Sequence, residues 1–94
     1  MSKFTVTYTR KATAALTSLY NLYRSQNKGF IITELELDIL QFLRHFADKG
    51  ITSHGFHFVT RRYPPNQNGY VGILKATYVI QGTTAKVLDF QDTP

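Results

Sequence analysis

The chain has 94 residues, of which 43% are hydrophobic and 14% aromatic, and this length and composition fit one folded domain over residues 1–94. It contains no cysteine, which excludes disulfide frameworks, thiolate zinc sites and cysteine nucleophiles and favours a cytoplasmic setting. No apolar run approaches the roughly 20 residues that span a bilayer, so no membrane association is expected. Eleven Lys and Arg against six Asp and Glu give a net charge of +5, which favours an anionic partner.

The charges are unevenly distributed along the chain. Residues 1–33 and 49–88 each carry five cations and no acid, whereas residues 34–48 carry four acids and one arginine. An acidic helix between two basic segments predicts that one side of the molecule is more basic than the other. The alternative is the ordinary solvated surface of a small basic protein.

The first half of the chain alternates between a strand pattern and two helix patterns. Lys3–Thr9 has polar and apolar residues in strict alternation, which predicts a strand. From Ala12 the apolar spacing changes to three and four, which predicts a helix with Thr9 as its N-cap and an end near Asn27–Gly29.

A second helix is predicted at about 34–48. Thr33 and Glu36 have the spacing of a capping box, and Ile32 and Leu37 have that of a hydrophobic staple. Gly50 is expected to stop this helix in a left-handed conformation. Periodicity leaves open whether Phe30–Ile32 forms a short strand or the apolar approach to the helix.

The second half of the chain returns to period two. We predict strands at 56–63, 70–80 and 85–90, with turns at Pro64–Gly69 and Gln81–Thr84 and with Leu88 and Phe90 on one face of the last strand. The predicted fold is therefore a single α+β domain with the element order β-α-α-β-β-β. Two helices pack on one face of an antiparallel sheet of about four strands.

Two stretches of this chain have counterparts in a known family. Phe4–Leu16 is an alternating strand that runs into a helix beginning with a small residue and a leucine, and Leu74–Leu88 contains a basic residue three before a tyrosine, a turn and a Val-Leu strand. Both stretches, and the order of the elements, resemble the RelE/ParE superfamily of bacterial toxins. Lys75 stands where that family usually has arginine.

The resemblance implies action on RNA or the translation machinery, or on a topoisomerase, and neutralisation by a cognate antitoxin. Endoribonuclease activity is one expectation. The competing class is a non-enzymatic phage or mobile-element inhibitor or adaptor, which binds a protein or nucleoprotein partner and blocks its site. The sequence leaves the oligomeric state open.

A cluster of cationic and aromatic residues lies on the two strands joined by the Pro64–Gly69 turn. Arginine grips two phosphate oxygens at once, and a tyrosine ring can stack on a base. Arg61 shares a strand face with His57 and Tyr63, whereas Arg62 lies on the opposite face, so the two arginines should not be equivalent. The alternative is that the arginines line a solvated edge strand and Tyr78 belongs to the core. The predicted site for nucleic acid or another partner comprises His57, Arg61, Arg62, Tyr63, Lys75 and Tyr78.

The sequence assigns no catalytic residue. His57 could act as a general base because histidine titrates near neutral pH, although a surface histidine is the alternative. On one extended strand His54 and His57 would face opposite sides, so no metal site is expected. The chain has no phosphate-binding glycine loop or nucleophile elbow, and we expect no cofactor. A helix-turn-helix is disfavoured, since a strand follows where its recognition helix would stand.

Overall fold

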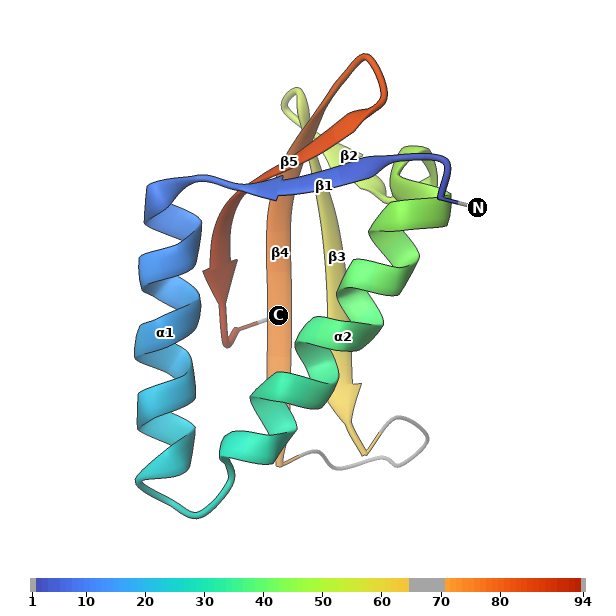
Figure 1. The fold of residues 1–94 in the computed structure, drawn as a ribbon. Coiled ribbons are helices and arrows are strands. Elements are labelled where there is room, and N and C mark those ends of the chain that lie inside the picture. The colour runs from blue at the N-terminus through green and yellow to red at the C-terminus, as the bar shows by residue number, and fades with distance from the viewer. Residues whose placement is uncertain (1, 65–70, 94) are drawn as a thin grey trace.

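The chain folds into one sheet with two long helices against it (Figure 1). A computed structural model describes residues 2–64 and 71–93. The helices are α1 (Arg10–Arg24) and α2 (Gly29–Phe46), followed by a 3-10 turn at Ala47–Lys49. The strands are β1 (Thr5–Tyr8), β2 (Ile51–Ser53), β3 (Phe56–Tyr63), β4 (Gly72–Gln81) and β5 (Thr84–Gln91). Most of the predicted turn at Pro64–Gly69 lies outside the described residues.

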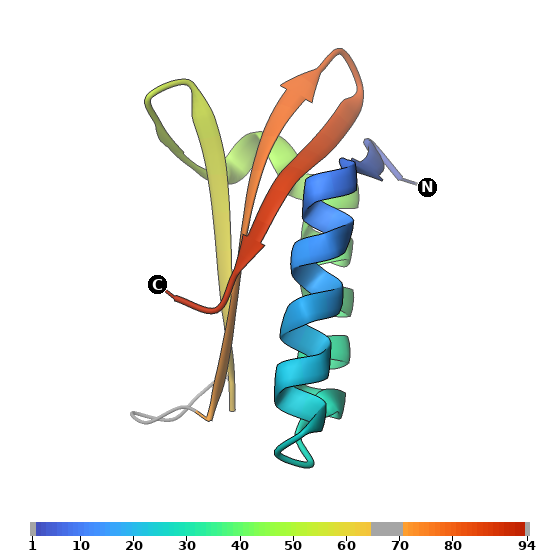
Figure 2. The ribbon, with the colours of Figure 1, turned by 90° about the vertical axis from the view of Figure 1, so that its left-hand side faces the viewer.

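The sheet has five strands in the order β1-β5-β4-β3-β2. Both helices lie on one side of it, and no helix of the described residues covers the other side (Figure 2). The α+β class and the helices on one face are confirmed, but the sheet is mixed rather than purely antiparallel, because β1 runs parallel to β5. About four strands were expected and the sheet has five, because β2 is too short to show a period in the sequence.

Helix α1 begins as predicted. The hydroxyl of Thr9 accepts a hydrogen bond from the Ala12 amide at 3.1 Å, as an N-cap does. The helix ends at Arg24, and Asn27 then takes a left-handed conformation with φ of 60°. Gly29, expected to help end α1, is instead the first residue of α2.

The predicted start of α2 is wrong, because the helix begins at Gly29 and already includes Phe30–Ile32. Thr33 is therefore no cap, and its hydroxyl donates to the Gly29 carbonyl within the helix. The predicted staple is absent as well, since Ile32 is buried and Leu37 is 60% exposed. Burial of Ile31 and Ile32 against the sheet stabilises the earlier turn more than a capping box would, because packing dominates helix stability in proteins.

Gly50 follows the 3-10 turn with φ of −67°, which is not the predicted left-handed conformation. Glycine is needed at this position because the backbone passes close to the hydroxyl of Tyr78, and a side chain there would overlap that hydroxyl. The core lies between the sheet and the helices. Its largest fully buried side chains are Ile31, Ile32, Ile39, Leu43, Leu74, Tyr78 and Val87.

Strand β5 contains an irregularity that the sequence did not predict. Tyr78 pairs with Val87 and Thr77 pairs with Asp89, so Leu88 is the extra residue of a β-bulge. Val87 and Phe90 are therefore buried together, and the expected pairing of Leu88 with Phe90 on one face is wrong. Within the described residues, neither helix combines the length and apolar character needed to cross a membrane.

Candidate functional site

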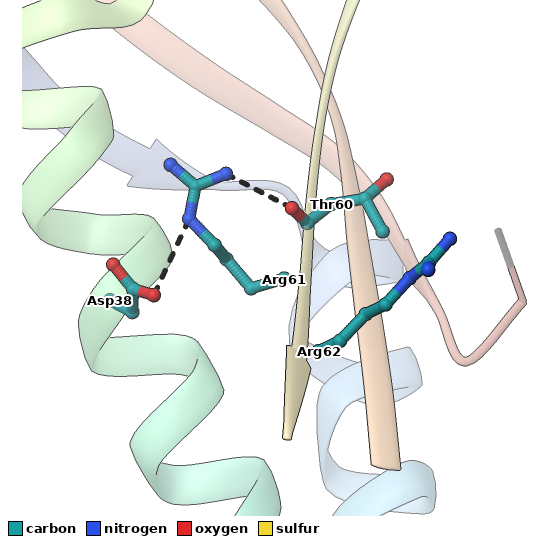
Figure 3. Close-up of a pocket in the computed structure, with 4 residues that line it drawn as sticks. All are labelled: Asp38, Thr60, Arg61 and Arg62. Atoms are coloured by element: carbon teal, nitrogen blue, oxygen red, sulfur yellow. Dashed lines mark hydrogen bonds and ion pairs between the residues drawn. The ribbon is translucent and has the colours of Figure 1, made fainter. Parts of the chain in front are cut away.

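The alternation of β3 divides the predicted site between the two faces of the sheet. Arg61 points towards α2, whereas Arg62 points to the opposite side of the strand (Figure 3). The register places Tyr78 beside His57 and Lys75 beside Thr60. The helix-covered face thus carries His57, Arg61, Tyr63 and Tyr78, and the open face carries Arg62 and Lys75. The two arginines occupy different environments, as predicted, and their unequal effects on binding remain a prediction.

Arg61 is held between α2 and the edge of β3. Its Nε lies 3.3 Å from a carboxylate oxygen of Asp38, and one terminal nitrogen donates to the Thr60 carbonyl at 3.0 Å. The guanidinium carbon also lies 5.0 Å from the ring centre of Phe42, in cation–π contact. These partners come from α2 and from β3 itself, so no spacing in the sequence could indicate the ion pair.

Tyr63 and His57, also on the helix-covered face, are engaged by aromatic contacts. The ring of Tyr63 packs edge-on against Phe30 at 5.9 Å between centres. His57 stacks on Tyr78 at 5.3 Å, with 22° between the ring planes. Its Nδ1 is also 3.4 Å from the Thr52 hydroxyl. His57 is therefore half-buried beside the core.

Tyr78 belongs to the core, which was the alternative to its predicted place in a binding site. Its side chain is fully buried, and its hydroxyl donates to the carbonyl of Ala47 at 2.5 Å. A ring in this position cannot stack on a base unless the core opens. Burial, reinforced by the negative charge of Asp48, raises the pKa of the Tyr78 hydroxyl to about 12.

This raised pKa predicts a loss of stability in alkali. An unfolded tyrosine ionises near pH 10, so Tyr78 stabilises the fold fully below about pH 10 and loses that contribution between about pH 10 and 12. The loss should reach about 2–3 kcal/mol, because each pKa unit corresponds to about 1.4 kcal/mol. Urea unfolding from pH 8 to 12 should therefore show a steeper fall for the wild type than for Tyr78→Phe. Parallel curves would contradict the prediction.

Tyr8 also contributes to the loss of folding stability in alkali. Its hydroxyl donates to Glu36 at 2.8 Å, and burial together with this acidic partner raises its pKa well above the ordinary value. Tyr8 is intact in both proteins of the alkaline experiment, so its contribution cancels from their difference.

The open face carries cations, one of which lies over an aromatic ring. The ammonium of Lys75 lies 4.9 Å from the ring centre of Phe58, which stands diagonally across on β3, two residues before Thr60. Lys86 belongs to the same face, because it pairs with Val79 and lies between the buried residues Ala85 and Val87. Sequence reasoning missed Lys86 and Phe58. The short turn at Gln81–Thr84 fixes the β4–β5 register and could have indicated Lys86.

The register also places an acid on this face. Asp89 pairs with Thr77 on β5 and lies 3.9 Å from the ammonium of Lys11. His54 has φ of 54° and belongs to the turn between β2 and β3 rather than to a strand. Across residues 2–64 and 71–93, no group of three or more His, Asp and Glu side chains could hold a metal ion.

The fold is shared with a protein of known structure. A chain from the chromosomal ParDE TA (toxin–antitoxin) system of P. aeruginosa aligns with a TM-score of 0.68 and 16% sequence identity, over 98% of each chain. No protein-family model matches, and comparison with curated proteins finds no significant match. This similarity supports, at the level of the fold, the layout of elements that the sequence predicted.

Proposed function

We propose that this chain is a toxin-like protein that acts on RNA or on the RNA-containing translation machinery through the open face of its sheet. The observation that carries the proposal is the set of cations on that face, with Lys75 above the ring of Phe58. Cations bind phosphate oxygens, and an aromatic ring beside them can stack on an unpaired base. The fold shared with a chain of the ParDE system supports a toxin-like role and a cognate antitoxin as a partner.

A second candidate is a non-enzymatic inhibitor or adaptor that uses the same face to block a partner's site. The position of His57 favours this non-enzymatic candidate over a catalytic one. His57 is the predicted general base, but it lies on the helix-covered face and stacks against Tyr78. A proton acceptor on that side does not reach a phosphodiester held over Lys75. Both candidates share the basic open face and differ in whether the chain by itself harms the cell.

Induced expression in a bacterial host tests the choice between them. The toxin-like proposal predicts growth arrest by the wild type and its loss in Lys75→Ala/Lys86→Ala. A matched control is Arg24→Ala/Lys49→Ala, which removes two exposed cations outside the open face and should still arrest growth. Normal growth with soluble, folded wild-type protein would contradict the toxin-like role. Growth arrest by all three proteins would exclude the open face as the surface that causes the arrest.

A further inference from the structure

The free edge of β3 carries a hollow that the proposed function does not use. Strand β2 pairs with Phe56–Phe58 only, so the described structure shows no strand beside residues 59–63 on that edge. A hollow of about 370 Å³ lies there (Figure 3). This volume is many times the roughly 10–15 Å³ that a cavity needs to hold one water molecule. The hollow is lined by Asp38, Thr60, Arg61 and Arg62.

Arg61 presents an oriented guanidinium to this hollow. Phe42 contacts the guanidinium group and the Thr60 carbonyl accepts one N–H, so two partners other than Asp38 hold the group in place. A guanidinium has five N–H donors. Within the described residues, the polar partners of this group are Asp38 and Thr60, which leaves further N–H groups to bind an anion.

Asp38 is a partner that an anion can replace. The side chains of Arg61 and Asp38 are 33% and 56% exposed, and ion pairs this exposed contribute little to stability. A phosphate group carries as much charge or more and can accept two parallel N–H bonds from one guanidinium. Replacing the Asp38 carboxylate by a phosphate therefore costs little free energy. It also gives the Arg61 guanidinium an acceptor whose oxygens fit its N–H groups better.

We propose that the hollow at the β3 edge binds a phosphate group and that Asp38 occupies the phosphate position on Arg61 when no ligand is present. Arg62 lines the same hollow and points to the open-face side. A nucleic-acid backbone that crosses the open face can thus continue over the β3 edge to Arg61. The identification of the ligand as a backbone phosphate rests on the proposed function, whereas phosphate binding itself does not.

Asp38→Asn tests the proposal because it removes the competing charge and keeps the size of the side chain. The control is Glu34→Gln, the same change of charge at an exposed position of the same helix. Binding of a labelled single-stranded RNA 12-mer should tighten at least about threefold more in Asp38→Asn than in Glu34→Gln. The extra gain should disappear in Asp38→Asn/Arg61→Gln. Equal gains in Asp38→Asn and Glu34→Gln, or a gain that persists without Arg61, would exclude RNA at the hollow.

Inorganic phosphate separates this inference from the proposed function. At constant ionic strength, phosphate in place of chloride should raise the melting temperature of Asp38→Asn more than that of Glu34→Gln, and Arg61→Gln should abolish the difference. A phosphate effect without RNA binding by any of the proteins would support the hollow as a site for a free phosphate group and contradict the proposed function. No phosphate effect and no RNA gain would overturn the inference.

Discussion

Replacing Tyr78 with alanine is expected to lower the free energy of unfolding by about 3–5 kcal/mol, the range for truncating a fully buried aromatic side chain. Tyr78 is 0% exposed, stacks with His57, and donates its hydroxyl hydrogen to Ala47. The substitution opens a cavity under α2 and leaves the Ala47 carbonyl without this donor. Because small domains are stable by only about 5–15 kcal/mol, a large share of the stability is lost.

Urea denaturation followed by circular dichroism measures this effect. Tyr78→Phe keeps the ring and loses the hydrogen bond, so it should cost only about 1–2 kcal/mol. Tyr20→Ala is the matched control, since Tyr20 is 37% exposed and its removal should have a much smaller effect. A Tyr78→Ala protein at least as stable as Tyr20→Ala would contradict the burial of Tyr78 in the core.

The second large effect concerns nucleic-acid binding. Lys75→Ala/Lys86→Ala is expected to weaken the affinity for single-stranded RNA about 25-fold near 0.1 M salt, because each lost phosphate contact on a single strand costs about fivefold. Arg24→Ala/Lys49→Ala changes the net charge equally outside the open face and should leave the affinity within about twofold. Fluorescence anisotropy with a labelled 12-mer measures both. Equal weakening by the two variants would mean that net charge, not the open face, determines binding.

Local patterns predicted the elements whose signals are confined to a few neighbouring residues. The period-two run ending at Tyr63 predicted where β3 ends and the opposite orientation of Arg61 and Arg62. The Thr9 cap was recognisable because its partner, the Ala12 amide, lies three residues away. These features depend on the strand period and on helix capping, both of which a single sequence shows.

Features that depend on distant residues could not be predicted. The parallel pairing of β1 with β5 joins segments from opposite ends of the chain. The start of α2 depends on Ile31 and Ile32 meeting the sheet, which overrides the capping signal at Thr33. The sequence predicted one cluster on the β3–β4 hairpin, but it could not show that α2 covers one face and supplies Asp38 to Arg61.

The salt dependence of RNA affinity tests the central claim, a phosphate-binding open face, most directly. A protein that neutralises phosphates releases counterions, so the logarithm of its affinity falls linearly with the logarithm of salt concentration, by about 0.7 per contact on a single strand. Between 50 and 300 mM salt, we predict that Lys75→Ala/Lys86→Ala has a slope about 1.4 units shallower than the wild type. Arg24→Ala/Lys49→Ala should keep the wild-type slope. An unchanged slope in the Lys75→Ala/Lys86→Ala protein, with its fold intact, would contradict the claim.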